Sequence, residues 1–235
     1  MKIIFFSDAH GNQYAVNSFF RQIKHIPYDM VIFGGDVFGY YYGTNEIIDK
    51  FREKKIRCLL GNHDKMFLDL IEEKITESEL VDKYGNSYKN IQSKISRTNI
   101  DFLYTLQSRF DMKIDGLNIS FVHGSINDPI NGRIYPDTII SEETSYCGID
   151  YVFCGHTHHK LIKKIDNTVL INAGSIGQQR DGKGCSFVVF DTVTCKFQTF
   201  KVKYDVTQLE REIRYNETGQ MQNKLIEVLY RSSTI

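Results

Sequence analysis

Six short apolar runs in this 235-residue chain each lead into a turn that contains glycine and polar residues of a kind that binds metal ions. The runs span residues 2–6, 30–33, 56–60, 118–122, 151–154 and 169–171. Runs of this length, rich in Ile, Val and Phe and bounded by glycine, are typical of buried strands. The chain is therefore expected to fold around several short buried strands that end in polar turns.

Helical patterns separate the first three runs. Apolar residues over 15–23 recur at helical spacing after Asn12, which we expect to cap this helix. Thr44 or Asn45 is expected to cap a second helix that runs through Phe51. The order strand–helix–strand–helix–strand predicts parallel strands joined by right-handed crossovers. In such sheets ligands bind beyond the carboxyl ends of the strands, where all six polar turns would lie.

The remaining segments show other patterns. Residues 65–110 are rich in Glu, Lys, Asn and Ser with apolar residues at helical spacing, and we expect a helical excursion near the site entrance. Residues 186–190 and 196–204 predict two further strands, and residues 206–231 predict a C-terminal helical segment. The sequence contains no internal repeat, low-complexity run or linker. We therefore expect residues 1–235 to form a single domain.

The charge balance argues against several classes of protein. Lys and Arg number 29, as do Asp and Glu, so no global field attracts nucleic acid or an anionic membrane. The apolar run Ile3–Phe6 is shorter than the roughly 7–15 residues of a signal-peptide core or the about 20 of a membrane span. The five cysteines form no CxxC pair, so we expect reduced thiols in a cytoplasmic protein.

Five of the seven histidines stand in the polar turns, together with Asp8, Asp36 and Asn62. These histidines are His10, His63, His123, His156 and His158. Buried carboxylates and imidazoles are costly without partners, and binding a cation in common removes that cost. Nitrogen and oxygen donors without thiolates suit Mn²⁺, Fe, Zn²⁺ or Co²⁺ better than Ca²⁺ or a structural Cys-rich zinc site. His25 and His159 stand outside this pattern, and we expect no direct role for them.

Five motifs follow one another along the chain: Asp-x-His-Gly from Asp8, Gly-Asp ending at Asp36, Gly-Asn-His-Asp ending at Asp64, His-Gly from His123 and Gly-His-x-His ending at His158. In this order they resemble the calcineurin-like metallophosphoesterases, over roughly residues 1–200. The resemblance is strongest to the small bacterial and archaeal phosphodiesterase-like branch, which carries Asn-Pro-Gly-Ser-x-Gly-x-Pro-Arg late in the chain. Residues 172–180 match that stretch except at Ala173 and Gln179, where proline is usual, so the conformation of this loop stays open.

The resemblance implies a four-layer α/β/β/α sandwich of two mixed sheets and two divalent metal ions, with Mn²⁺ favoured. Carried over position by position, it implies that one ion is held by Asp8, His10, Asp36 and His158. The other ion would be held by Asp36, Asn62, His123 and His156, so that Asp36 bridges the pair. His63 matches the histidine that contacts the phosphate and protonates the leaving oxygen, and Asp64 is expected to orient its ring.

The function that the resemblance implies is hydrolysis of phosphate esters, with phosphodiesters or small nucleotides as the expected substrates. Two cations lower the pKa of a bridging water, and the resulting hydroxide attacks phosphorus in line. His63 and the metal ions neutralise charge on the phosphate oxygens. Arg180 is a candidate for binding a substrate phosphate, with a surface-loop position as the alternative. Tyr40 is a candidate for stacking on a nucleobase, with core packing as the alternative.

Three other functions stay open. A nuclease would need a basic groove or an added nucleic-acid module, and neither is visible at net charge zero. A serine/threonine-type protein phosphatase is disfavoured by the short chain and by motifs that match the phosphodiesterase branch better. An interaction scaffold on the same fold would lack metal ligands, whereas every ligand of the pattern is present here. The sequence identifies neither the metal, the substrate, the preference for monoesters or diesters, nor the oligomeric state.

Overall fold

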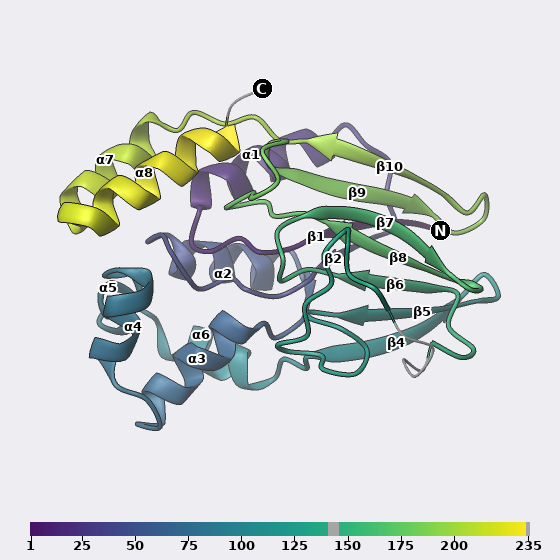
Figure 1. Cartoon of the computed structure of the whole chain (residues 1–235), viewed down its shortest axis with the longest axis horizontal. Helices are drawn as coiled ribbons and strands as arrows, with labels where there is room; N and C mark the ends of the chain where they lie inside the picture. The colour runs from purple at the N-terminus through teal and green to yellow at the C-terminus, as the bar shows by residue number, and fades with distance from the viewer. Residues whose placement is uncertain (141–145, 234–235) are drawn as a thin grey trace.

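Two five-stranded sheets pack face to face in the computed structural model, which describes residues 1–140 and 146–233 (Figure 1). The first sheet has the strand order β10-β9-β1-β2-β3. Its strands are β1 (Lys2–Phe6), β2 (Met30–Phe33), β3 (Arg57–Cys58), β9 (Ser186–Asp191) and β10 (Lys196–Lys201). The second sheet has the order β4-β5-β6-β8-β7. Its strands are β4 (Arg109–Ile114), β5 (Leu117–Val122), β6 (Tyr151–Cys154), β7 (Lys160–Ile165) and β8 (Thr168–Ala173).

Parallel pairing joins the strands for which the sequence predicts it. β2 lies between β1 and β3 and is parallel to both. In the second sheet, β6 is parallel to β5 and to β8. Antiparallel strands complete the sheets, with β9 and β10 in the first and β4 and β7 in the second. The predicted α/β fold with two mixed sheets is therefore confirmed.

The described residues form eight helices. They are α1 (Gln13–Ile23), α2 (Thr44–Glu53), α3 (Asn62–Ile71), α4 (Glu77–Tyr84), α5 (Ser87–Gln92), α6 (Arg97–Tyr104), α7 (Thr207–Asn216) and α8 (Gly219–Ser233). The segment predicted as a helical excursion holds most of α3 and all of α4–α6, and the C-terminal segment holds α7 and α8. Of the described helices, none has the length and apolar character to cross a membrane.

Side chains of β1 alternate between two cores. Ile3 and Phe5 face the second sheet, where Phe5 lies 5.3 Å from Phe153 between ring centroids. Ile4 and Phe6 face the helices, and the Phe6 ring stacks on Phe19 of α1 at 4.2 Å. Because both faces of this strand are buried, its residues form a continuous apolar run rather than an alternating one.

The segment between β5 and β6 covers the outer face of the second sheet. Its residues Ile126, Ile134 and Tyr146 form an apolar cluster with Val152 and Leu170 of that sheet. Among the described residues, no helix lies between β5 and β6. In the described residues of this segment, the outer layer is irregular chain.

Two strands, β4 and β7, lie outside the segments predicted as strands. Both are edge strands, and β7 in particular alternates between buried or half-buried and exposed residues. Their sequences, RFDMKI and KLIKKI, therefore lack the continuous apolar run that marks the central strands. The predicted strand over 196–204 ends earlier, at Lys201.

The two predicted helix caps have different outcomes. Asn12 caps α1 as expected, because its side-chain oxygen accepts a hydrogen bond from the amide of Ala15 at 3.1 Å. The prediction of Thr44 or Asn45 as the cap of α2 is wrong, because Gly43 is the N-cap and Thr44 is already helical. Gly43 makes no side-chain cap, so no polar side chain marks this boundary in the sequence.

Candidate metal centre

The carboxyl ends of the parallel strands of both sheets meet at one place. The amide of Asp8, after β1, donates to the carbonyl of Gly35 after β2 at 2.9 Å. The amide of His156, after β6, donates to the Asp8 carboxylate at 3.1 Å and so joins the second sheet to the first. The amide of His63, after β3, donates to the Asp36 carboxylate at 2.8 Å. The predicted meeting of the polar turns at one edge is therefore confirmed.

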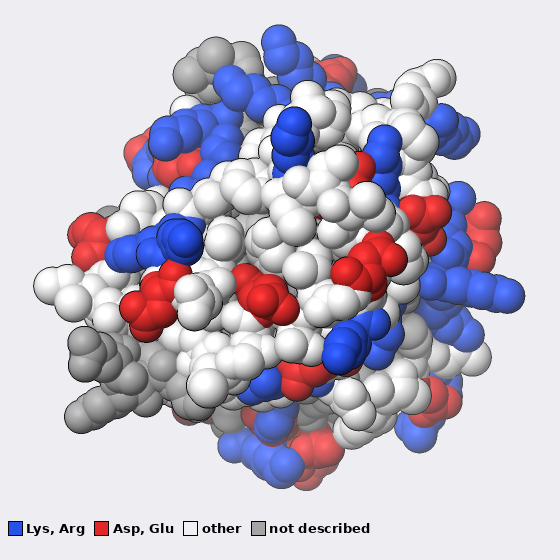
Figure 2. All heavy atoms as spheres, turned by 90° about the vertical axis from the view of Figure 1, so that its right-hand side faces the viewer, with Lys and Arg blue, Asp and Glu red and all other residues white. Residues whose placement is uncertain are grey.

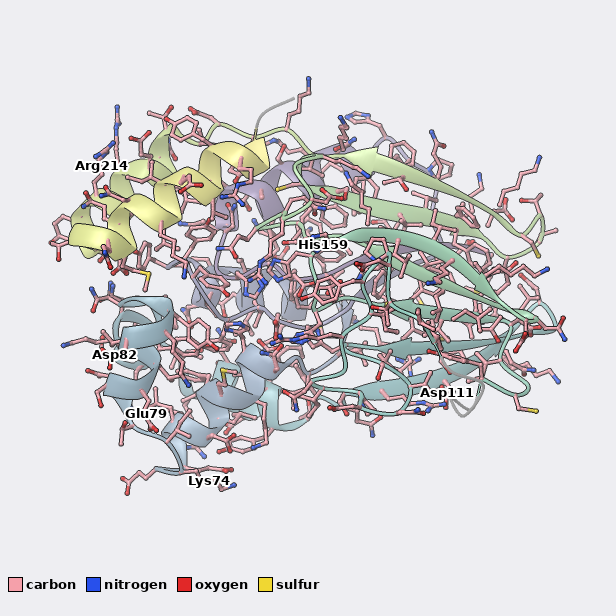
Figure 3. The ribbon with its side chains drawn as sticks, viewed as in Figure 1. Lys74, Glu79, Asp82, Asp111, His159 and Arg214 are labelled. Atoms are coloured by element: carbon pink, nitrogen blue, oxygen red, sulfur yellow. The ribbon has the colours of Figure 1, made fainter. Side chains whose placement is uncertain are left out.

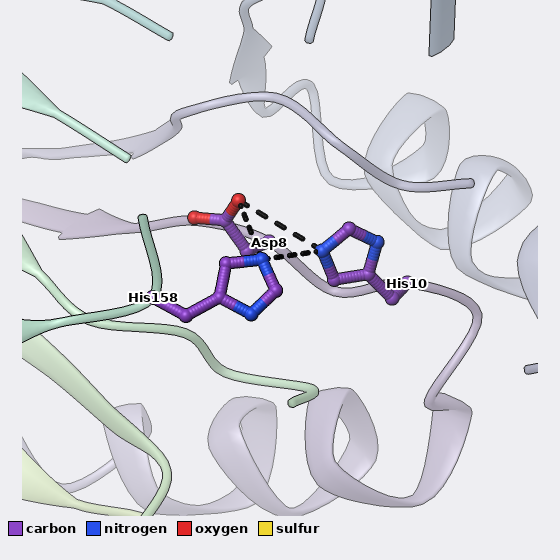
Figure 4. A group of neighbouring side chains, drawn as sticks. All are labelled: Asp8, His10 and His158. Carbon is purple, nitrogen blue, oxygen red and sulfur yellow. Dashed lines mark hydrogen bonds and ion pairs between the residues drawn. The ribbon is translucent and has the colours of Figure 1, made fainter. Parts of the chain in front are cut away.

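Asp8, His10 and His158 form the first cluster of metal-binding atoms (Figure 4). The Nε2 atoms of His10 and His158 lie 2.8 Å apart. Asp8 Oδ1 lies 3.4 Å from His158 Nε2 and 3.9 Å from His10 Nε2. All three side chains are fully or almost fully buried. Three ligand atoms of nitrogen and oxygen thus converge on one buried point.

Asp36, His123 and His156 form the second cluster, in which the ligand atoms all lie within 4.8 Å of one another. His123 Nε2 lies 3.3 Å from Asp36 Oδ2. Asn62 Oδ1 joins this cluster at 3.0 Å from the same nitrogen. The structure therefore brings together all seven residues predicted as metal ligands. Their role as ligands stays a prediction.

One oxygen of Asp36 lies between the two clusters. Asp36 Oδ2 is 3.3 Å from His123 Nε2 in one cluster and 3.9 Å from His10 Nε2 in the other. This oxygen is buried and accepts no hydrogen bond from the described part of the chain. A buried carboxylate oxygen without a partner is unfavourable by about 1–3 kcal/mol or more. A cation on either side would remove that penalty, so the residues present fit a pair of metal ions bridged by Asp36.

Backbone carbonyls orient three of the histidines. Each accepts a hydrogen bond from an Nδ1 atom: Phe38 from His10 at 2.7 Å, Gly34 from His123 at 2.8 Å and Gln178 from His158 at 2.6 Å. A carbonyl oxygen only accepts, so Nδ1 carries the hydrogen and Nε2 keeps its lone pair for a cation. This is the outer-shell arrangement that usually supports metal-binding histidines.

The backbone at the centre is held in an uncommon conformation. Asp8, His10, Asp36, His156 and His158 all have φ between 48° and 65°, in the left-handed region. For residues with a Cβ this region is unfavourable by roughly 1–2 kcal/mol each. The surrounding hydrogen bonds hold these residues in place, and the conformation turns their side chains inward directly after the strands.

Charges inside the centre favour binding of a cation. Burial acts to raise the pKa of Asp8, but the neighbouring His158 outweighs it and lowers that pKa to about 2. Burial likewise opposes ionisation of Asp36, whose pKa is nevertheless held well below its usual range by His123 and His63. Burial lowers the pKa of His156 to about 4 and that of His10 well below its usual value. Ionised carboxylates beside neutral imidazoles are a donor set suited to a divalent cation.

The Asp36 carboxylate also acts on His123. Burial lowers the pKa of His123, but Asp36 and Asp8 together more than compensate and raise that pKa to about 9. Its Nε2 faces Asp36 Oδ2 at 3.3 Å, so a proton and a cation would compete for this nitrogen.

Asp64 and His63 make different contacts from those expected. The Asp64 carboxylate accepts hydrogen bonds from four backbone amides, those of Asp36 (2.8 Å), Val37 (2.8 Å), Phe38 (3.1 Å) and Gly61 (2.9 Å). The expected contact to the His63 ring is made instead by Tyr88, whose hydroxyl lies 2.7 Å from His63 Nδ1. Asp64 thus fixes the turn after β2, and Tyr88 fixes the imidazole. No pattern in the sequence singles out Tyr88, which lies within the helical excursion.

Three tyrosines surround His63, and we call Tyr40, Tyr84 and Tyr88 the tyrosine wall. Between ring centroids, Tyr40 lies 5.3 Å and Tyr84 lies 4.7 Å from His63. His63 also offers a ligand atom within 4.8 Å of those of His10 and Asp36. The imidazole of His63 is therefore placed between the tyrosine wall and the metal-binding atoms.

Two arginines stand at the rim of the centre. Arg180 Nη2 donates to the Tyr40 hydroxyl at 2.8 Å, and the Tyr40 ring lies 5.0 Å from the His10 ring. Arg133 Nε donates to His156 Nε2 at 3.1 Å. In the part of the chain that the structure describes, neither guanidinium lies within 4.0 Å of a carboxylate. Arg133 was not singled out from the sequence.

The loop over residues 172–180 closes the centre from the side of β8. Ser175 Oγ donates to the carbonyl of Asp8 at 2.7 Å. The Gln179 side chain accepts from the amide of Ser175 at 2.6 Å. Gln179 thus stabilises the turn internally at a position where proline is usual in the family. His159, labelled in Figure 3, belongs to none of the His/Asp clusters found among the described residues, and its Nδ1 contacts the carbonyl of Thr157 at 2.6 Å.

The fold and this site together define a class of protein. Two His/Asp clusters lie at the strand ends of a two-sheet α/β sandwich with one carboxylate oxygen, Asp36 Oδ2, between them, which is an arrangement suited to a pair of metal ions. The model of the calcineurin-like phosphoesterase superfamily domain matches residues 1–195. The chain therefore belongs to the calcineurin-like phosphoesterase superfamily, whose members are metal-dependent phosphoesterases as a class.

Relatives match the chain over almost its full length. An uncharacterized protein of Methanocaldococcus jannaschii is 28% identical in an alignment over 232 residues. The match covers 89% of this chain and 90% of that protein. The crystal structure of a metallophosphoesterase from Sphaerobacter thermophilus is similar with a TM-score of 0.79 and 23% identity, covering 99% of both chains. The crystal structure of a hypothetical protein from Pyrococcus horikoshii has a TM-score of 0.81 and 17% identity, covering 100% of this chain and 99% of that one. The C-terminal helices α7 and α8 thus lie within the region aligned to both structures, although they fall outside the family model.

Proposed function

We propose that this protein is a phosphoesterase that uses two divalent cations, with Mn²⁺ favoured, to hydrolyse phosphodiesters or small nucleotides. The observation that carries the proposal is Asp36 Oδ2, a buried oxygen without a hydrogen-bond partner in the described structure that lies between two nitrogen-rich clusters. An oxygen in this position is suited to bridge two cations. Two bound cations would supply the charge that lowers the pKa of water from about 15.7 towards neutrality and stabilises phosphate oxygens.

The residues of the chain would divide the work. Asp8, His10 and His158 hold one side of the centre, and His123, His156 and Asn62 hold the other, with Asp36 in common. His63 stands beside both and is the group that would contact the substrate phosphate and protonate the leaving oxygen. A fixed arrangement of this kind contributes to catalysis because the groups need no reorganisation during reaction.

Tyr88 would set which nitrogen of His63 carries the proton. Its hydroxyl donates to the His63 carbonyl at 3.3 Å, and its oxygen lies 2.7 Å from His63 Nδ1. Because a carbonyl only accepts, the Tyr88 hydrogen is used there, and Nδ1 of the neutral ring donates to the Tyr88 oxygen. Nε2 then keeps the lone pair that takes up a proton, and the protonated ring can pass that proton to a leaving oxygen.

The rim of the centre supports an anionic, aromatic substrate. Arg180 and Arg133 offer guanidinium groups without carboxylate partners among the described residues, and such groups bind phosphate well. The half-buried rings of Tyr40 and Tyr84 offer apolar surface to a nucleobase or another aromatic group. These features favour a nucleotide or an aryl phosphodiester over a simple alkyl phosphate.

The alternatives lack supporting features of this kind. A nuclease would require a continuous basic surface, whereas the chain has equal numbers of basic and acidic residues, and the one face that Figure 2 shows carries both kinds intermingled. A scaffold protein on this fold would have no need of the complete set of metal-binding residues.

We also propose a cytoplasmic protein without a membrane partner, because all five cysteines are free thiols.

The test combines metal analysis with one panel of substrates. Purified protein is analysed for bound metal and then assayed with Mn²⁺ against a phosphomonoester, a phosphodiester, cyclic nucleotides and dinucleoside polyphosphates. We expect bound transition metal and fastest hydrolysis of a phosphodiester or nucleotide. A preference for the monoester would contradict the diester assignment and leave the phosphoesterase class standing. Protein without metal that hydrolyses nothing would contradict the whole proposal.

A further inference from the structure

The tyrosine wall is connected to the C-terminal helices through the short junction between α4 and α5. Tyr84 ends α4, Tyr88 lies in the first turn of α5, and Asn86 stands between them. In Figure 1, α4 and α5 lie next to α7 and α8 at the end of the molecule away from the strands. The junction is therefore in contact with the catalytic centre on one side and with the C-terminal helices on the other.

Glu217 makes the central contact between these helices. This residue follows α7 and is only 2% exposed. Its Oε1 accepts hydrogen bonds from the amide of Asn86 at 2.7 Å and from the hydroxyl of Tyr42 at 2.9 Å. Its Oε2 accepts from Asn86 Nδ2 at 3.2 Å. One buried carboxyl group thus binds the junction that carries Tyr84 and Tyr88 and also the loop that carries Tyr40.

Close packing around Glu217 leaves little room for another arrangement. Gly85 has a φ of 78°, and a Cβ at this position would lie 2.7 Å from Glu217 Oε1. Asn86 Nδ2 also donates to the carbonyl of Asn216 at 2.7 Å, and Asn90 Nδ2 donates to the Asn216 side chain at 3.0 Å. A side chain at position 85 would therefore displace the carboxyl group, and Asn86 donates to both of its oxygens.

The C-terminal helices hold Glu217 in place from behind. The Glu217 amide donates to the carbonyl of Ile213 at 2.9 Å, and its carbonyl accepts from Gln222 Nε2 at 2.6 Å. Leu209 and Leu225 pack in an apolar cluster with Tyr41, which stands between Tyr40 and Tyr42 in the chain. Both sides of the tyrosine wall thus rest on α7 and α8.

We propose that Glu217 is a positioning residue that fixes the tyrosine wall, and through Tyr88 the imidazole of His63, against the catalytic centre. The proposal rests on the proposed function for its catalytic consequence. Glu217 lies beyond residues 1–195, the part matched by the family model. The residues after 195 therefore align the proposed proton donor through α7 and α8. The metal-binding turns, which lie within residues 1–195, do not provide this alignment.

The test compares Glu217→Ala and Glu217→Gln with the control Glu210→Ala. Glu210 lies on α7, but its side chain contacts only Arg214 and Tyr230 among the hydrogen bonds and ion pairs described. Arg214 points away from α4 and α5 (Figure 3). Glu217→Gln keeps one oxygen that can accept from Asn86 and Tyr42, so it should act as a partial rescue.

Three readouts are measured on Zn²⁺-loaded protein: amide hydrogen exchange over residues 77–92, the imidazole ¹⁵N shifts of His63, and kcat and KM for a phosphodiester. We expect Glu217→Ala to accelerate exchange at least about tenfold, to shift the His63 nitrogens, and to lower kcat about tenfold with a smaller change in KM. Glu217→Gln should show intermediate effects in all three readouts. Glu210→Ala should match the wild type in each.

The outcomes separate this proposal from the proposed function. Unchanged exchange and unchanged His63 shifts in both Glu217 variants would overturn it, as would altered exchange with wild-type His63 shifts. Should Glu217→Ala fail to fold, the same readouts on Glu217→Gln decide. If the wild type hydrolyses no phosphoester, the proposed function fails, while the exchange and the ¹⁵N shifts still show whether Glu217 positions His63.

Discussion

The strand-end turns and the helices around them build the two halves of the candidate site by different means. The turns after β1, β2, β3, β5 and β6 carry every predicted metal ligand, and backbone hydrogen bonds connect them to one another. The tyrosine wall depends on helices α4 and α5, which side chains such as Glu217 hold in place from a distant part of the chain. The comparison predicts that the proposed metal binding and the alignment of the proposed proton donor can be changed separately.

The largest expected effect is in the turns. Asp36→Asn replaces one oxygen of the shared carboxylate by an amide and removes its charge, so both clusters should lose affinity for metal. We expect turnover to fall by at least about 10³-fold and metal content to drop at both sites. Metal analysis and kinetics measure the two effects. Full metal occupancy in this variant would show that Asp36 does not hold the ions.

His63→Ala tests the boundary between the two halves. His63 contacts both the metal-binding atoms and the tyrosine wall, and its proposed role is proton transfer. We expect kcat to fall by about 10²–10⁴-fold while the metal content stays close to that of the wild type. The control is His159→Ala, which lies outside the centre and should behave like the wild type. Loss of metal in the His63 variant would instead place His63 among the ligands.

Tyr88→Phe tests the tyrosine wall alone. The substitution keeps the ring and removes the hydroxyl that contacts His63 Nδ1. We expect kcat to fall about tenfold, with unchanged metal content, because the ring of His63 loses its orienting hydrogen bond. The matched control is Tyr104→Phe, whose exposed hydroxyl contacts Glu72. An equal loss in both variants would show that the Tyr88 hydroxyl has no specific role.

The smallest expected effect is a pH dependence of stability at Glu217. Burial raises the pKa of this carboxyl group above 4.5, although Asn86 and Tyr42 oppose the shift. A raised pKa in the folded state means that stability is fully present below about pH 4.5 and declines as the pH rises through the folded-state pKa. Glu217→Gln should therefore gain stability relative to the wild type as the pH increases over this range. Urea unfolding of both proteins measures the difference, and a difference independent of pH would contradict the assignment.

Much of the fold is predictable because the central strands are buried on both faces. β1, β2, β6 and β9 appear in the sequence as continuous apolar runs, and the parallel pairing of β1 with β2 follows from the helix α1 between them. Edge strands β4 and β7 escape prediction because their polar residues interrupt any such run. The N-cap of α2 is not predictable from the sequence because Gly43 has no side chain that could mark it.

The candidate site is likewise predictable from the sequence only in part. The positions of the metal-binding residues follow from the sequence alone, because each stands within a few residues of a strand end and parallel strands bring those ends together. The contacts of Asp64, Tyr88, Arg133 and Glu217 arise only in the tertiary structure. Glu217 is 131 residues from its partner Asn86, and Tyr88 is 25 residues from His63. Such contacts depend on how helices dock against one another, and no local periodicity records that docking.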